Sequence, residues 1–335
     1  MITRCWRSWM RANWCFTFRR VGLGCMLAMP LAGVSAPMTI AVSRTPLSLP
    51  LYVAEAEKFF SAENVDVVLR DCMGGNRCMR EVEDGAADYA TAPDVPIALW
   101  AFQPGNWSIV ATFATAANDV KIVARKGTRL AEVPDWARKR IGMTPVSASQ
   151  YFLETVLLTI GVDPATVATV PLPPETLAEA LNSGKVDAIS VWEPFAHSAV
   201  QASKGDLAVV ATRGVYRETF NLVAANKHVM ASSAETARLL RAIDRANTFI
   251  AEHPARAQAV LRARLGVDDA FIQSIWPNVR YRLSLDQGLL KTLESEARWA
   301  IRESHVKADR IPNFLPLFHT APMLSVKPDS AGIAR

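Results

Sequence analysis

The sequence has few cysteines, no excess of charge of one sign after its first 36 residues, and no apolar run of about 20 residues that would span a membrane. Five of its 37 basic residues fall within those first 36 residues, which contain no acid. The rest of the chain therefore has as many basic as acidic residues. The net charge of +5 does not, for this reason, indicate a nucleic-acid or membrane-surface partner.

The motifs of common enzyme classes are also missing. There is no nucleophile elbow, no HExxH, no GxGxxG after a predicted strand and no phosphate loop. The five histidines are scattered without the spacing of metal ligands, and we expect them at the surface or at helix ends: His197, His228, His253, His305 and His319. The sequence therefore predicts no catalytic residue, no metal site and no cofactor.

Residues 1–36 have the layout of a secretory signal peptide. Basic residues ending in Arg19-Arg20 precede an apolar run at 21–34, and small residues predict cleavage near Ala36. A transmembrane anchor is the alternative, although the run is shorter than the roughly 20 residues of a span. Cys25 only half matches a lipoprotein box, and Arg19-Arg20 lacks the Phe-Leu of a twin-arginine signal. We expect general export to the periplasm.

The two cysteines beyond this segment are Cys72 and Cys78, on either side of a glycine-containing loop. In an oxidising compartment they predict a short-loop disulfide. A zinc site is disfavoured because no nearby His or third Cys completes a set of four ligands.

Short β-branched runs alternate with amphipathic segments, which predicts two α/β lobes built on mainly parallel sheets. We expect strands at 39–42 and 65–69 and helices at 51–60 and 76–84. From about residue 232 to residue 304 the pattern is nearly all helical, with apolar residues at helical spacing.

An internal repeat supports the division into two lobes. Residues 83–90 and 182–189 share a helix end followed by a glycine, an aspartate three residues later, and a short strand. Gly85 and Gly184 suit the left-handed conformation at a helix end, and we expect Asp88 and Asp187 to hold the turn into the strand. The pattern is common in α/β proteins and can recur by chance. It therefore supports two lobes only in combination with the other sequence features.

Three extended runs indicate where the chain passes between the lobes. Runs at 109–113, 120–124 and 220–225 would form a two-strand hinge with an inserted lobe of about one hundred residues between its crossings. We therefore expect a first lobe of residues 37–116 plus 226–325, a second lobe of residues 117–225, and a flexible tail of residues 326–335.

The best candidate ligand site is the segment 142–152, which leads from a strand into a helix through hydroxyl residues. Ser147 and Ser149, with the adjacent Gln150, would surround exposed helix amides suited to a sulfonate, a carboxylate or a ring nitrogen. The alternative is that each serine only caps its own helix.

Further candidates follow other predicted strands. Trp192 would cover a ring or an alkyl chain, and Glu193 would accept from an amine or amidine, although the indole could instead fill the hinge. In the first lobe we expect ligand contacts from Ser43, Arg44, Gly75 and Thr91. Arg44 would favour an anion, unless it is a solvated loop arginine.

These motifs together resemble a known family. Ser149-Gln150-Tyr151-Phe152-Leu153, Pro171-Leu172-Pro173-Pro174, residues 180–188 and Trp192-Glu193-Pro194-Phe195 occur in the order seen in the sulfonate, nitrate, taurine and thiamine-pyrimidine (SsuA/NMT1-like) group of ABC-transporter solute-binding proteins. Residues 51–60 and 85–90 are similar to that group's first lobe. The helix usually opened by Glu-Lys-Gly has Glu57-Lys58-Phe59 instead, and the cysteine loop is unusual for the group.

The resemblance implies a type II periplasmic-binding-protein fold and a monomer that binds a small organic solute for an ABC permease. The solute would be a sulfonate, a nitrate- or taurine-like anion, or a pyrimidine-type compound. One alternative is an enzyme like the pyrimidine synthases on the same fold, which need a lysine for pyridoxal and a cysteine-rich iron site. Another is a periplasmic subunit that reports its ligand to a membrane receptor.

Overall fold

The structure, a computed structural model, describes residues 37–126, 136, 138–212 and 214–333. The predicted signal peptide, with its cleavage site and Cys25, lies outside the described residues. Within the described part of the chain, no helix is both long enough and apolar enough to cross a membrane.

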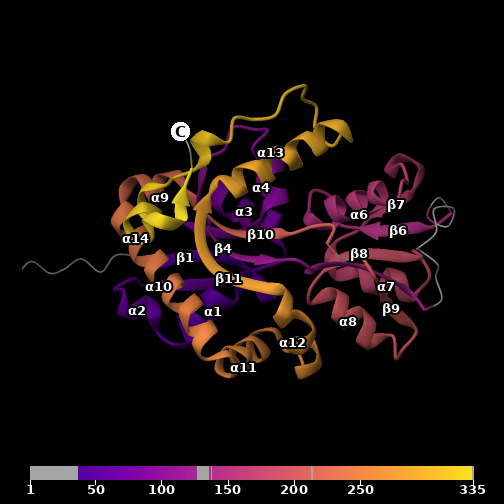
Figure 1. Ribbon diagram of the computed structural model, residues 1–335, viewed down its shortest axis with the longest axis horizontal. Helices are drawn as coiled ribbons and strands as arrows, with labels where there is room; N and C mark the ends of the chain where they lie inside the picture. Colours follow the sequence, from indigo (N-terminus) through magenta and orange to yellow (C-terminus); the bar gives the residue numbers. More distant parts are fainter. Residues whose placement is uncertain (1–36, 127–135, 137, 213, 334–335) are drawn as a thin grey trace, which may run out of the picture. The chain divides into compact units, whose positions relative to one another are not determined.

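Seven strands of the described chain form the larger sheet (Figure 1). Their order across the sheet is β12 (Ala331–Gly332), β11 (Val279–Asp286), β4 (Trp107–Ala116), β10 (Glu218–Ala225), β3 (Tyr89–Pro93), β1 (Met38–Ser43) and β2 (Val67–Cys72). The β1–β2, β1–β3 and β11–β12 pairs are parallel, whereas β10 and β4 run antiparallel to their neighbours.

Helices cover both faces of this sheet. α1 and α10 lie on one side, and α3, α4 and α13 lie on the other (Figure 1). The helices packed with this sheet are α1 (Leu49–Ala56), α2 (Phe59–Ala62), α3 (Gly75–Glu83), α4 (Asp94–Trp100), α9 (Asn226–Ala231), α10 (Ser233–Glu252), α11 (Pro254–Leu265), α12 (Asp269–Ile275), α13 (Gln287–Arg302) and α14 (Ala321–Val326).

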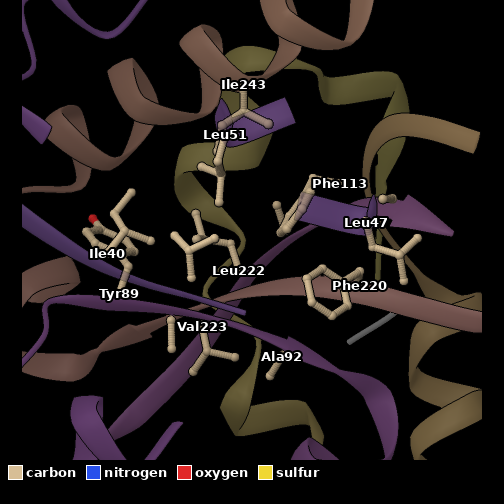
Figure 2. Packing of buried hydrophobic residues seen from close by; sticks show 14 of the residues in the cluster. Ile40, Leu47, Leu51, Tyr89, Ala92, Phe113, Phe220, Leu222, Val223 and Ile243 are labelled. Carbon is tan, nitrogen blue, oxygen red and sulfur yellow. The ribbon is translucent and has the colours of Figure 1, made fainter. Parts of the chain in front are cut away.

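The buried core of the larger lobe lies between the sheet and these helices. Leu51 of α1 and Ile243 of α10 lie next to one another and face Leu222 of β10 (Figure 2). Phe113 and Phe220, from the adjacent strands β4 and β10, meet edge to face with ring centroids 5.6 Å apart. Their burial removes large apolar areas from water, which is the main favourable contribution to folding.

The smaller sheet has five strands among the described residues, with β5 as a central antiparallel strand. The order is β7 (Ala168–Pro171), β6 (Arg140–Met143), β8 (Ala188–Trp192), β5 (Val120–Arg125) and β9 (Leu207–Val210), packed with α6 (Ala148–Thr159), α7 (Leu177–Asn182) and α8 (Phe195–Ala202). β6 pairs in parallel with both β7 and β8.

The chain passes twice between the sheets. Residues 117–119, the first crossing, join β4 to β5, and the second crossing joins β9 to β10. Two α/β lobes linked by two crossings are what the sequence predicted.

The internal repeat has the same structure in both lobes. Gly85 and Gly184 follow α3 and α7 with φ of 72° and 74°, as the left-handed helix end requires. Asp88 accepts a hydrogen bond from the backbone N–H of Thr39, and Asp187 accepts one from that of Arg140, at 2.9 and 2.8 Å. Each aspartate thus ties its turn to the start of the neighbouring parallel strand, rather than only holding its own turn.

Several expected elements differ in the structure. β11 interrupts the region that was expected to be helical, and its burial alternates along Val279–Asp286 as in a strand. β10 was placed in the second lobe but pairs with β3 and β4 in the larger sheet. The expected flexible tail includes β12, which pairs with β11. The single helix at 51–60 divides at Lys58, whose φ is 59°.

Candidate functional site

A cavity of about 440 Å³ lies where the carboxyl ends of parallel strands from both sheets meet. Its larger-lobe wall includes Ser43, Thr45 and residues 73–77 at the start of α3, and its smaller-lobe wall includes residues 144–148, 171–174 and Trp192. Asp119, Glu218 and Phe220 line it beside the crossings. Strand ends of this kind are the usual ligand sites of open α/β sheets, and this volume suits a small molecule.

Four residues singled out from the sequence line this cavity: Ser43, Gly75, Ser147 and Trp192. Trp192 also brings the lobes together, since a Cβ added to Gly74 would lie 3.2 Å from its Cζ2 atom. Gly75 begins α3, and a Cβ there would lie 2.3 Å from Cδ of Pro93. Both glycines therefore permit a close approach that a side chain would prevent.

Ser147 lines the cavity with its hydroxyl group already engaged. Its Oγ accepts from the N–H of Ser149 at 3.1 Å, as an N-cap of α6, and donates to the carbonyl of Thr144 at 2.7 Å. These contacts fix the start of α6 next to the cavity.

Ser149 and Gln150 do not line the cavity. Ser149 Oγ donates to the carbonyl of Ser190 on β8 at 2.6 Å, and Ser190 Oγ donates back to the carbonyl of Ser149 at 2.8 Å, so the pair fastens α6 to the sheet. Gln150 accepts from the N–H of Val146 at 3.0 Å and donates to Glu154 at 3.1 Å. Their contacts position the helix rather than face the cavity.

Arg44, Thr91 and Glu193 also lie outside the cavity lining. The half-exposed Arg44 contacts Asp71 at 3.7 Å. Thr91 is buried, and its Oγ1 accepts from the N–H of Ser43 at 2.9 Å. Glu193 forms an ion pair with Lys121 through Oε1, and its Oε2 accepts a hydrogen bond from the backbone N–H of His197 at 2.9 Å. Both carboxylate oxygens therefore have partners within the protein.

The sequence reasoning missed the two carboxyl groups beside the crossings, Asp119 and Glu218. Both are buried, with 6% and 3% of their surface exposed, and both line the cavity. Their positions were within or next to the hinge that the extended runs indicated. The extended runs predicted where the chain crosses between the lobes. They did not predict that side chains beside the two crossings would lie close together.

Burial dominates the electrostatics of this pair. It raises the pKa of Asp119 to about 7, assisted by the nearby Glu193 carboxylate and opposed by Lys121. Burial, together with the Asp119 and Asp94 carboxylates, raises the pKa of Glu218 well above its ordinary value. The two carboxyl groups lie close enough for each to influence the pKa of the other.

The loop that carries Gly74 and Gly75 is held by a disulfide. Cys72, the last residue of β2, is bonded to Cys78 in α3, with their Cα atoms 5.6 Å apart. The bond closes the segment that forms part of the larger-lobe wall. Among the described residues no group of three or more His, Cys, Asp and Glu side chains is placed to hold a metal ion.

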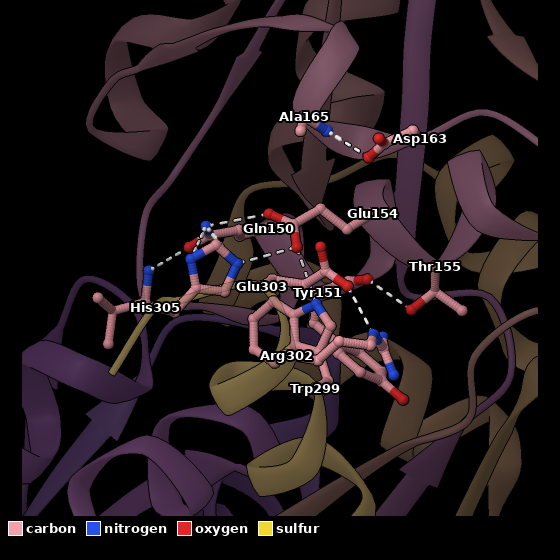
Figure 3. Close-up of polar contacts among 11 residues, drawn as sticks. Gln150, Tyr151, Glu154, Thr155, Asp163, Ala165, Trp299, Arg302, Glu303 and His305 are labelled. Carbon is pink, nitrogen blue, oxygen red and sulfur yellow. Dashed lines mark hydrogen bonds and ion pairs between the residues drawn. The ribbon is translucent and has the colours of Figure 1, made fainter. Parts of the chain in front are cut away.

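Polar contacts join the lobes at two places. Arg77 of α3 forms an ion pair with Glu175 of the smaller lobe at 3.0 Å. Away from the cavity lining, Glu154 of α6 accepts from Trp299 Nε1 at 2.8 Å and lies 2.9 Å from His305 Nε2 (Figure 3). The lobes are thus in contact both beside the cavity and away from it.

Comparison with known proteins agrees with this arrangement. The family model described as NMT1/THI5 like matches residues 45–257. The structure is similar to the alkanesulfonate-binding protein SsuA from Xanthomonas axonopodis pv. citri bound to MOPS, with a TM-score of 0.73 and 17% identity over 83% of this chain and 96% of that one. It is similar to the periplasmic aliphatic sulphonate binding protein SsuA from Escherichia coli, with a TM-score of 0.71 and 15% identity over 84% and 97%.

An enzyme shares the architecture as well. The desulfurization enzyme DSZB has a TM-score of 0.63 and 16% identity, over 88% of this chain and 99% of that one. Comparison with curated proteins gives no match. At these identities the likenesses show the fold, and the predicted periplasmic-binding-protein fold is confirmed.

Proposed function

This chain belongs to the NMT1/THI5 like family, and from that premise we propose that it is an exported solute-binding protein. It holds a small organic molecule between its two lobes, leaves that molecule chemically unchanged and delivers it to an ABC permease. The observation that carries the proposal is the cavity of about 440 Å³ at which the strand ends of both sheets meet.

The two crossings supply the means of opening and closing. The lobes are joined covalently there, and their other contacts are side-chain pairs such as Arg77 with Glu175 and the approach of Trp192 to Gly74. A ligand that contacts both walls stabilises the form in which they meet by its differential affinity for that form. The closed form would be the one that the permease recognises.

Within this proposal, Ser43, Gly75, Ser147 and Trp192 contact the ligand. Trp192 presents its ring to the cavity beside the apolar residues Met73 and Phe220. A flat or extended apolar body would be covered on more than one side by these side chains.

The proposal is tested with the full chain, exported by a bacterial host. Unfolding temperatures would be measured with a panel of alkanesulfonates, nitrate, pyrimidines, aromatic carboxylates and organic amines. A ligand present at 100 times its Kd adds about 2.7 kcal/mol of stability, which corresponds to a rise of about 4 °C for a domain pair of this size. Recovery of the ligand unchanged after prolonged incubation is the second expected result.

An enzymatic function is the alternative, because the desulfurization enzyme DSZB has a similar fold. The described residues that line the cavity include neither Cys nor His, and Cys72 and Cys78 are joined in a disulfide. These observations favour binding over covalent catalysis. Chromatographic detection of a converted product with any compound that binds would establish the enzymatic reading in place of ours.

A further inference from the structure

Neither of the two cavity-lining acids beside the crossings, Asp119 and Glu218, forms an ion pair with a Lys or Arg of the described residues, since Lys121 is paired with Glu193. Both are buried and line the cavity, and the buried Oε2 atom of Glu218 has no hydrogen-bond partner among the described residues. Its side chain is 3% exposed and lines the cavity. A buried polar atom without a donor is costly unless a ligand or another group satisfies it.

The surroundings of the pair are strongly acidic. Lys121 is the single buried Lys or Arg of the described residues, and its ammonium group is already paired with Glu193. Two further buried acids, Asp94 and Glu296, interact electrostatically with Glu218. Asp119 and Glu218 therefore present two carboxyl groups to the cavity, with no unpaired buried Lys or Arg of the described residues beside them.

Positive charge is scarce elsewhere in the cavity. Arg77 is the one Lys or Arg among its described lining residues, and half of its side chain is exposed where it pairs with Glu175. The remaining walls include Trp192 and Phe220. A small anion held deep in this cavity would lie against two buried carboxyl groups with little screening by solvent.

We infer that the ligand has a nitrogen group that is cationic or donates several N–H bonds, such as an amine, an amidine or a protonated nitrogen heterocycle, and that Asp119 and Glu218 hold this group. The inference rests on the proposed function and narrows it from small organic solutes to nitrogen bases. The apolar body of the ligand then lies against Trp192 and Phe220.

Matched probes test the inference. Benzamidine and benzylamine would be compared with benzoate and benzenesulfonate by calorimetric titration of the full chain at pH 8, since the four share one ring and differ in the charged group. The nitrogen bases are expected to bind at least about ten times more tightly than the anions. Tighter binding of either anion overturns the inference and leaves the proposed function standing.

Isosteric variants locate the binding group. Glu218→Gln and Asp119→Asn each replace a carboxyl group by an amide of nearly the same shape, and each is expected to weaken benzamidine binding at least about tenfold. Glu296→Gln is the matched control, because Glu296 is buried as well but does not line the cavity, and the affinity of this variant is expected to fall much less than that of the other two. Equal affinity of all three variants overturns the inference.

Failure of the inference and failure of the proposed function give different results. If none of the four probes binds at millimolar concentration but a compound of the wider panel does, and that compound has no basic or N–H-donating nitrogen, the inference alone is wrong. If no compound of either set binds, both are wrong. Unfolding curves of each variant verify that it is folded.

Discussion

Asp119→Asn is expected to raise the stability of the ligand-free protein at pH 8 and to reduce its dependence on pH. Burial raises the pKa of the Asp119 carboxyl from 3.8 to about 7. Between these values the folded state binds more protons than the unfolded state, so the free energy of unfolding falls as pH rises through this window. A shift of this size corresponds to about 4 kcal/mol of lost stability above pH 7.

The difference between the variant and the native protein isolates this single group. Other groups titrate in the same range, but they are present in both proteins and their contributions largely cancel. Burial and nearby carboxylates raise the pKa of Glu218 well above its ordinary value, and Glu218 is present in both proteins. The groups that act on Asp119 or Glu218 are Asp94, Lys121, Glu193, Tyr216, Tyr281 and Glu296.

Urea unfolding from pH 5 to pH 8 measures the effect. The stability gained by Asp119→Asn is expected to grow by about 3 kcal/mol across this interval, because each pH unit below the folded pKa is worth about 1.4 kcal/mol. A gain that does not change with pH would show that Asp119 is not buried as described. A variant that is less stable than the native protein at pH 8 would refute the reasoning outright.

Three further predictions concern the walls of the cavity. Trp192→Ala is expected to weaken any ligand at least about tenfold in calorimetric titration through the lost contact area, whereas His253→Ala, which lies outside the cavity lining, should leave affinity unchanged. Gly75→Ala places a methyl group 2.3 Å from Cδ of Pro93, so its unfolding temperature should fall, and an unchanged value would contradict the close approach. Cys72→Ser opens a loop with a sequence separation of 6 and should cost about 2 kcal/mol in urea unfolding; a reductant should then destabilise the native protein but not the variant.

Local sequence patterns predicted the elements that depend on neighbouring residues. Strands and helices with a clear apolar period were found close to their expected positions, as for β1 at Met38–Ser43 and α3 at Gly75–Glu83. β11 was missed because it lies within a long region of mostly helical pattern, and its place depends on pairing with β4, far away in the sequence. Distant pairing of this kind leaves no local signal.

The candidate site was predicted in part, for the same reason. Ser43, Gly75, Ser147 and Trp192 were found from the rule that ligands lie at strand ends. The rule cannot tell which side chain turns into the cavity and which fastens its own element, as Ser149 does to Ser190. That choice depends on how α6 packs on β8.

The sequence alone determined the two-lobed α/β organisation, the repeated helix–glycine–aspartate–strand unit and the family resemblance. Each of these depends on patterns of residues that are close together along the chain. The tertiary structure decided the chemical character of the cavity. Asp119 and Glu218 are 99 residues apart in the numbering. Asp119 lies in the first crossing and Glu218 begins β10 after the second, and only the return of the chain through β10 brings their carboxyl groups together, where burial raises the pKa of both.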